Sequence, residues 1–274
     1  MVHRQLCGAG ILFVACLCVA FESGAAIIAS SGFNDAAGLN SNSTPNSPFT
    51  IGQTVDGRGA GEPGWADNWL VQQGGALGGG EHALILGAAA LEGDGGLQLE
   101  PNPVFGQTRA IRRLATPQNR RFVIEQDVNF IGVNSLYSRP SSSAVSNEGV
   151  SIGPEWRISG PIGNRHFDVL DGIGDQLESN WESTGIDAKP GEWQHVLLDI
   201  NVATQTWTFS VDGVMYNSPD PLGFRGTPPN IDNIEYITDS SGYIDSVVVR
   251  DAPEPAFLAL APLGIAFFAL RRRR

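Results

Sequence analysis

Apolar and polar residues alternate along several short stretches, which is the pattern of β-strands that bury one face. The alternation is clearest at residues 121–130, 193–200 and 207–211. In the first stretch Phe122, Ile124 and Val128 fall on one face. Asp212-Gly213 follows the third stretch and precedes another apolar run. Because both residues of that pair tolerate positive φ, the pattern predicts a β-hairpin.

Further short apolar runs, separated by Gly, Pro and Asn, predict more strands and many turns. These runs lie at residues 82–86, 97–99, 149–152, 155–158, 166–170, 234–237 and 243–250. No stretch holds a helical period over three turns, although the alanines of residues 81–91 are compatible with a short helix. The predicted fold is all-β, a single large jelly-roll β-sandwich over residues 26–250.

Two segments carry a resemblance to a known fold family. Gly191-Glu192-Trp193-Gln194-His195-Val196, followed by the 207–213 hairpin, resembles the late hairpin of laminin-G-like, concanavalin A-like sandwiches. The closing run at residues 243–249 is similar to their last strand, which pairs near the first. The resemblance implies a sandwich that hosts lectins, glucanases, adhesion modules and inert structural domains, so it leaves function open.

The N-terminus has the pattern of a secretory signal peptide. Arg4 precedes an apolar stretch at residues 6–21, and small residues follow it at 23–26. We predict a signal helix over residues 1–25, with an uncleaved anchor as the alternative. All three cysteines lie within it, so the mature chain is predicted to form no disulfide and no thiolate metal site.

The C-terminus has three parts, Pro253-Glu254-Pro255, an apolar stretch at residues 256–270, and Arg271, Arg272, Arg273 and Arg274. As a helix the stretch is about 22 Å long, against about 30 Å for a bilayer core. The arginines are expected to stay cytoplasmic. The apolar stretch therefore predicts a short transmembrane helix within residues 251–274.

These three parts resemble the PEP-CTERM sorting signal of Gram-negative bacteria, and a plain tail anchor is the alternative. The resemblance implies an exosortase and the secretion machinery as partners, often beside exopolysaccharide export. The chain is then expected to be exported and held in the membrane through its C-terminus. After processing it would lie at the cell surface or outside the cell.

The charge of the chain is strongly acidic. Its 274 residues carry a formal net charge of −12, and residues 26–252 keep 12 basic and 27 acidic residues, or −15. A nucleic-acid-binding protein needs a basic surface, so nucleic acid is excluded as a partner. An acidic surface should repel anionic polymers and can attract divalent cations.

Two carboxylates, Glu125 and Asp127, share one predicted strand face and are the strongest catalytic candidates. Glucanases of this fold use Glu-x-Asp-x-x-Glu, and retaining glycosidases need two carboxyl groups about 5–5.5 Å apart. Phe130 occupies the third acidic position here. The motif therefore lacks its acid/base, and we assign no catalytic residue and predict no enzyme.

Three aspartates, Asp168, Asp171 and Asp175, surround a glycine-rich turn. Their oxygens are the ligands that Ca²⁺ prefers, although the spacing matches no EF-hand. Calcium is thus the only cofactor that the pattern suggests, and a solvated turn is the alternative. No two histidines have metal-ligand spacing.

Exposed tryptophans can stack on the C–H faces of sugars. Trp181 lies among polar residues and Trp65 in a glycine-rich segment, so both are glycan-binding candidates. Trp156, Trp193 and Trp207 follow strand periodicity and are assigned to the core. The sequence predicts a non-catalytic surface or matrix protein that binds extracellular polysaccharide. A glycoside hydrolase or lyase, or a purely structural matrix component, are the alternatives.

Overall fold

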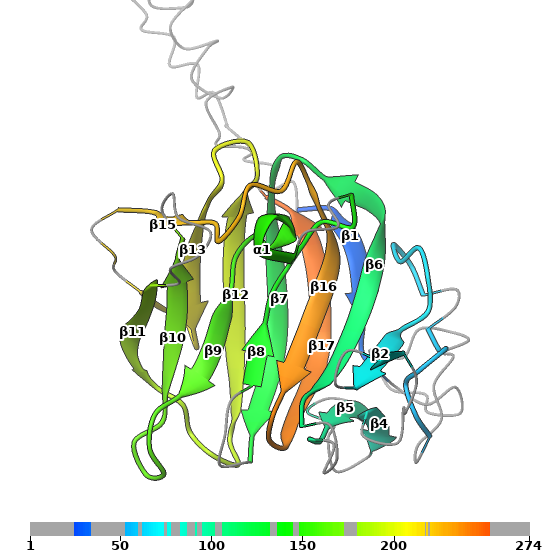
Figure 1. The fold of residues 1–274 in the computed structure, drawn as a ribbon, viewed down its shortest axis with the longest axis vertical. Coiled ribbons are helices and arrows are strands. Elements are labelled where there is room, and N and C mark those ends of the chain that lie inside the picture. The colour runs from blue at the N-terminus through cyan, green and yellow to red at the C-terminus, as the bar shows by residue number, and fades with distance from the viewer. Residues whose placement is uncertain are drawn as a thin grey trace, which may run out of the picture.

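The computed structural model describes most of the central part of the chain and consists almost entirely of strands. The described residues are 25–33, 53–59, 62–73, 76–77, 83–86, 91, 95–101, 106–131, 136–144, 148–172, 180–216, 218 and 220–252. They form two antiparallel sheets that face each other as the layers of a sandwich (Figure 1). A one-turn helix, α1 (Glu148–Ser151), lies in front of the nearer sheet in this view.

The rear sheet in Figure 1 has nine strands, with seven in the order β14-β13-β12-β7-β17-β5-β4. Strand β1 also pairs with β17, and β15 with β13. Their bounds are β1 (Ile27–Ser31), β4 (Ala83–Leu86), β5 (Gly96–Leu99), β7 (Arg121–Phe130), β12 (Trp193–Asn201), β13 (Thr206–Val211), β14 (Val214–Met215), β15 (Leu222–Gly223) and β17 (Gly242–Asp251).

The front sheet has eight strands in the order β11-β10-β9-β8-β16-β6-β2-β3. Their bounds are β2 (Leu70–Gln73), β3 (Ala76–Leu77), β6 (Thr108–Gln118), β8 (Leu136–Ser138), β9 (Trp156–Ser159), β10 (His166–Asp171), β11 (Asn180–Asp187) and β16 (Ile231–Thr238).

The core lies between the sheets and is rich in aromatic side chains. Trp156 and Phe167 of the front sheet pack against Phe209 of the rear sheet, with ring centres 6.0 and 5.9 Å from it. The Tyr236 hydroxyl donates a 2.6 Å hydrogen bond to Oε1 of Gln126, which joins the sheets through a buried polar contact. Burial of the Tyr236 hydroxyl raises its pKa well above the usual value.

The strands with the clearest alternation are confirmed. Side chains of β7, β12 and β13 alternate between buried and more exposed positions along most of each strand. The predicted hairpin turn is also present, because Asp212 and Gly213 have φ of 51° and 76°. The expected pairing of the last strand with the first is confirmed, since β17 is antiparallel to β1.

Other local predictions are corrected by the structure. Residues 149–152 were expected to be extended, but α1 occupies most of them. Within residues 81–91, where a short helix was the alternative, residues 83–86 form strand β4. Strands β1, β2, β3, β6, β8, β11 and β15 lie outside the predicted runs. The predicted signal helix and sorting signal lie outside the described residues, and within those residues no helix has the length and hydropathy to span a membrane.

Candidate functional site

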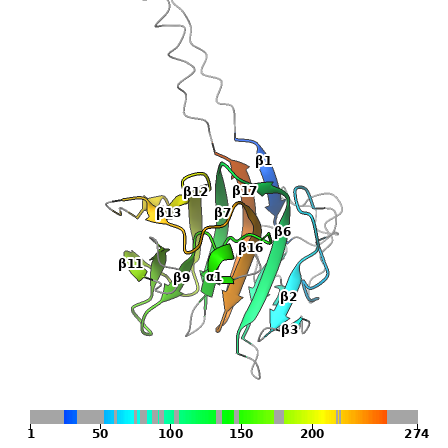
Figure 2. The same ribbon diagram turned by 45° about the horizontal axis from the view of Figure 1, so that its top comes forward.

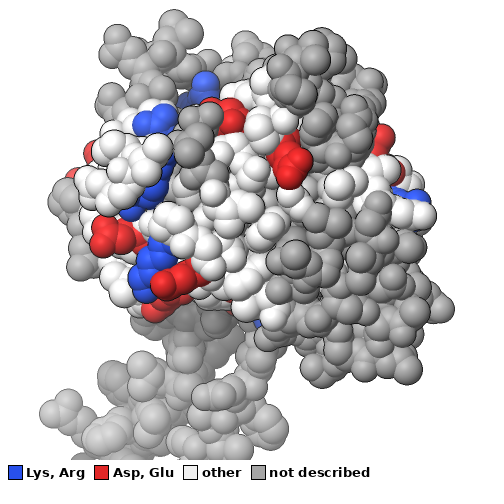
Figure 3. Space-filling model, turned by 90° about the horizontal axis from the view of Figure 1, so that it is seen from below, with Lys and Arg blue, Asp and Glu red and all other residues white. Residues whose placement is uncertain are grey.

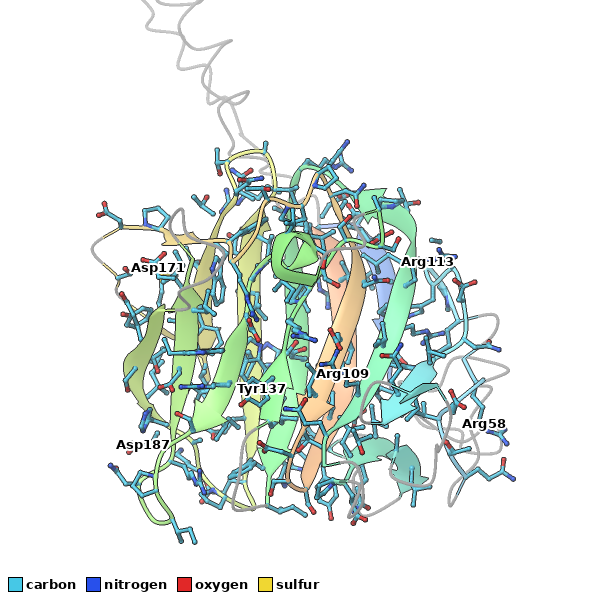
Figure 4. All side chains as sticks on the ribbon, in the orientation of Figure 1. Arg58, Arg109, Arg113, Tyr137, Asp171 and Asp187 are labelled. Carbon is cyan, nitrogen blue, oxygen red and sulfur yellow. The ribbon has the colours of Figure 1, made fainter. Side chains whose placement is uncertain are left out.

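Polar and aromatic side chains cover the outer face of the front sheet. Phe167 and Val169 of β10 point into the core, so the intervening Asp168 points outward. Strand register places Tyr137 beside Arg157 and Arg157 beside Asp168. Three neighbouring strands therefore contribute one row of outward side chains, and Tyr137 is labelled on this sheet in Figure 4.

Trp181 belongs to the same outer face, on the edge strand β11. It pairs in register with Leu170, two residues from Asp168, and its side chain is half-buried. The guanidinium carbon of Arg157 lies 4.0 Å from the centre of the Trp181 ring. Tyr137 meets the same ring edge to face, with centroids 6.2 Å apart and planes at 66°. We call Tyr137, Arg157 and Trp181 the aromatic platform.

Asp168 holds Arg157 of the platform in place. Its Oδ2 accepts a 3.1 Å hydrogen bond from Arg157 Nε and another from the Ser159 hydroxyl. His166 Nε2 lies 3.0 Å from its other oxygen, Oδ1. Only 5% of Asp168 is exposed, so the carboxylate is an internal support for the platform. Such support fixes the guanidinium before any ligand arrives.

The outer face continues across β16 and β6 as a second charged cluster. Glu235 Oε2 accepts a 2.7 Å hydrogen bond from Arg139 Nε, and Glu235 Oε1 lies 3.5 Å from Arg109 NH1. Arg109 is labelled on the same sheet as Tyr137 in Figure 4. Arginine side chains, which donate hydrogen bonds, therefore lie on both sides of Tyr137 on this face, with Arg157 on one side and Arg109 on the other.

A pocket of about 300 Å³ lies where this face meets the loops at one end of the sandwich. The β9–β10 connection contributes Asn164 and Arg165, and the β11–β12 region contributes Asp187, Lys189 and Glu192. Seen from that end, most visible Lys and Arg atoms form a stripe on the left, flanked by Asp and Glu (Figure 3).

The structure does not bring the predicted calcium ligands together. Asp168 points outward beside Arg157, whereas Asp171 lies three residues along β10 and accepts a 2.9 Å hydrogen bond from the Gly223 backbone nitrogen. Asp175 lies outside the described residues. In the described part of the chain, no three His, Cys, Asp or Glu side chains form a group able to hold a metal ion.

The two tryptophans chosen as glycan contacts have different surroundings. Trp181 is on the outer face, but the structure corrects the choice of Trp65, of which only 8% is exposed. Trp65 Nε1 donates a 2.9 Å hydrogen bond to the Ser30 carbonyl, and Arg112 lies over its ring at 4.6 Å. A ring enclosed in this way offers no face to a sugar.

The core assignment holds for Trp156 and Trp207, which are 0% and 1% exposed. It fails for Trp193, which is half-buried on the outer face of the rear sheet. Its ring lies 6.4 Å from that of Tyr243. The odd positions of β12 face outward, which explains why Trp193 does not share the buried side of Val196.

The catalytic candidates Glu125 and Asp127 lie on the outer face of the rear sheet, away from the aromatic platform. Glu125 Oε1 is 3.3 Å from Arg250 Nε, and Asp127 Oδ1 is 2.9 Å from His195 Nδ1. The hydrogen bond to Asp127 raises the pKa of His195, although partial burial opposes the shift. Phe130, at the missing third position, is buried in the core.

Tyr137 and Arg157 were not identified from the sequence. Arg157 lies between the apolar Trp156 and Ile158, so alternation could have given its outward position, but Tyr137 is followed by the buried Ser138 and alternation could not. Their meeting with Trp181 depends on the order β11-β10-β9-β8, which alternation does not give. The sorting-signal residues Pro253, Glu254, Pro255 and Arg271–Arg274 lie outside the described residues.

Comparison with known proteins gives no family for the chain. No family model matches it. No curated protein matches it either. Among solved structures, an endo-1,3-beta-glucanase from Streptomyces sioyaensis is similar with 13% identity and a TM-score of 0.48, over 83% of this chain and 96% of that one.

A sialidase is similar with 13% identity and a TM-score of 0.48, over 68% of this chain, which spans only 17% of the sialidase. The carbohydrate binding module CBM66 from Bacillus subtilis is similar with 8% identity and a TM-score of 0.40, over 57% of this chain and 86% of that one. At such identities and TM-scores, the function has to be argued from this chain's own residues.

Proposed function

We propose that this chain is an exported, non-catalytic protein of the cell surface or extracellular matrix that binds polysaccharide on its aromatic platform. The sandwich would be a jelly roll of the concanavalin A-like kind, and an exosortase would process the C-terminal signal. The observation that carries the binding proposal is the contact of Tyr137, Arg157 and Trp181 on one outward sheet face.

The chemistry of the platform suits a sugar ring. Aromatic side chains offer large apolar surfaces to the C–H faces of a sugar, while a guanidinium donates hydrogen bonds to its hydroxyl groups. Both kinds of group are present within one platform. Because Asp168 and Ser159 already fix this part of the face, little side-chain entropy would be lost when a glycan binds.

The carboxylates of this face favour binding over hydrolysis. Asp168 is paired with Arg157, Glu235 with Arg139, and Glu155 with Arg225, whose NH1 lies 2.9 Å from Glu155 Oε2. Glycosidases need one carboxyl group that carries a proton to the leaving oxygen. A carboxylate bound to an arginine has its oxygens occupied as acceptors, so none of these three suits that role.

The test compares two tryptophan variants of the purified protein on a polysaccharide array. Trp181→Ala removes the platform ring, and Trp193→Ala is a matched control because Trp193 is half-buried on the opposite sheet. We expect Trp181→Ala to weaken binding about tenfold, which corresponds to about 1.4 kcal/mol, and Trp193→Ala to leave it unchanged. Equal affinities of the two variants would remove the platform as the binding site.

The same preparations decide between binding and catalysis. Incubation with each bound polysaccharide should release no new reducing ends and no unsaturated uronate products. Release of either by the unmodified protein, and its loss in Trp181→Ala, would establish a hydrolase or lyase in place of a binding protein.

The export proposal is supported by the sequence pattern at the two ends and is tested separately. We expect the unmodified chain to be recovered outside the cytoplasm without its C-terminal arginines, as measured by mass spectrometry. A change of Glu254 to Ala should leave the tail uncleaved and the protein in the membrane fraction. Cleavage that is unaffected by this change would contradict processing through the Pro-Glu-Pro motif.

A further inference from the structure

The pocket beside the aromatic platform contains an arginine without a carboxylate partner. In the part of the chain that the structure describes, nine other arginines have a carboxylate oxygen within 4.0 Å, whereas Arg165 has none. Its guanidinium carbon instead lies 5.7 Å from the centre of the Phe130 ring. Arg165 is half-buried, so its positive charge is held in the wall of the pocket.

The backbone fixes the position of Arg165. Its carbonyl accepts a 2.9 Å hydrogen bond from the Ala188 nitrogen, which ties the β9–β10 connection to the end of β11. Phe130, only 2% exposed, supports the guanidinium from the core side. A cation over an aromatic ring is attracted to it, but an oxygen ligand can still bind at the edge of the guanidinium.

The other lining groups are those that sugar hydroxyls require. Asn164 supplies an amide, and Asp187 and Glu192 supply carboxylate oxygens. Lys189, the second cation of the pocket, lies 3.9 Å from Glu192 and is balanced by it. The four charged side chains of the lining sum to zero, so the pocket lacks the excess negative charge of the rest of the body, and Arg165 is its cation that no carboxylate of the described residues binds. A volume of about 300 Å³ leaves room for a sugar ring that carries a charged substituent.

We propose that this pocket binds a uronate unit of the polysaccharide, with its carboxylate on the Arg165 guanidinium. The inference rests on the proposed function and names the ligand class, an acidic polysaccharide. The pocket lies at one end of the strands that carry the platform, since His166, next to Arg165, pairs in register with Ser159 of β9 and with Asp187 of β11. A single chain can therefore place one sugar on the platform and a uronate in the pocket. A planar guanidinium matches a carboxylate bidentately.

The test measures binding of uronate oligosaccharides, built from galacturonate, mannuronate or glucuronate, each compared with its methyl ester. The ester keeps the sugar and removes only the negative charge. We expect the unmodified protein to bind at least one acid about tenfold more tightly than its ester, and Arg165→Gln to bind the two equally. Arg58→Gln is the matched control, because Arg58 is half-buried like Arg165 and lies on the other side of the molecule from Asp187 (Figure 4).

Each outcome separates this inference from the proposed function. If acid and ester bind equally and Trp181→Ala weakens both, the uronate assignment is overturned and the platform stands. If Arg165→Gln keeps the preference for the acid, the pocket is not its source. If no uronate oligosaccharide binds while a neutral polysaccharide on the array still binds through Trp181, the uronate assignment is overturned and the proposed function stands. Arg165→Lys, which keeps the charge, should retain part of the preference and shows that the pocket is still folded.

Discussion

The buried ion pair between Arg112 and Glu62 offers the sharpest test of how this core is stabilised. Arg112 occupies a core position on β6, and its side chain and that of Glu62 are 0% and 3% exposed. The guanidinium also donates to the Ser31 hydroxyl at 3.3 Å. It lies 4.6 Å from the Trp65 ring and 5.5 Å from the Trp69 ring. The change Glu62→Gln keeps the shape of this cluster and removes its negative charge.

The loss of stability expected for Glu62→Gln follows from the burial of both charged groups. Burial raises the pKa of Glu62 and lowers that of Arg112, and the attraction between the two charges opposes both shifts. Without Glu62 the arginine charge stays buried and uncompensated, a situation that costs about 3–5 kcal/mol. Gln can still bond to Ser31, so we expect the low end of this range. The free energy of unfolding should fall by about 3 kcal/mol, which lowers the melting temperature by about 6–12 °C.

The assay is urea unfolding followed by tryptophan emission, because Trp65 and Trp69 lie against the changed cluster. A second variant that adds Arg112→Met to Glu62→Gln removes the orphaned charge and should recover part of the lost stability. Our reasoning is wrong if Glu62→Gln costs less than about 1 kcal/mol. It is equally wrong if the double variant is less stable than the single one.

Two further predictions concern backbone space and pH. In Gly64→Ala, the new Cβ would lie 1.8 Å from the Ile28 carbonyl oxygen at a φ of 82°, so we expect thermal unfolding to show a large loss of stability or no folded protein. The raised pKa of His195 means that its bond to Asp127 stabilises the fold fully below the unfolded pKa, about 6.5, and that this contribution is lost as the pH rises through the folded value. Asp127→Asn should flatten this part of the stability–pH curve, and an unchanged curve would exclude the pair as its cause.

The fold could be predicted from the sequence where strands alternate cleanly. Strand β7 was recognised because its buried positions are mostly apolar. Strand β6 was missed because Arg112 occupies one of its core positions, and a charged residue there interrupts the apolar pattern. Strand β11 was missed because it lies at the edge of a sheet and has few apolar residues, so alternation is weak.

The candidate site could be predicted only in part. A polar context marked Trp181 correctly as a residue of the outer face, but the same kind of argument failed for Trp65, which is buried and bonded to the Ser30 carbonyl. Proximity to Gly172 suggested a shared role for Asp168 and Asp171, but strand geometry sends residues three apart to opposite faces. The platform itself depends on strand order, a long-range property that no local pattern contains.

The pairing of the first strand with the last sets the end of the sandwich at which the chain enters and leaves it. Ile27 lies opposite Arg250, and the Asp251 nitrogen bonds to the Ala26 carbonyl, so both strands enter and leave at one pole (Figure 2). Asp251 also lies opposite Phe122, whereas Gly191, near the uronate pocket, bonds to Phe130 at the far end of β7. These poles are about 27 Å apart along that strand. A tether attached after Asp251 would therefore leave the pocket at the end of the sandwich away from the attachment.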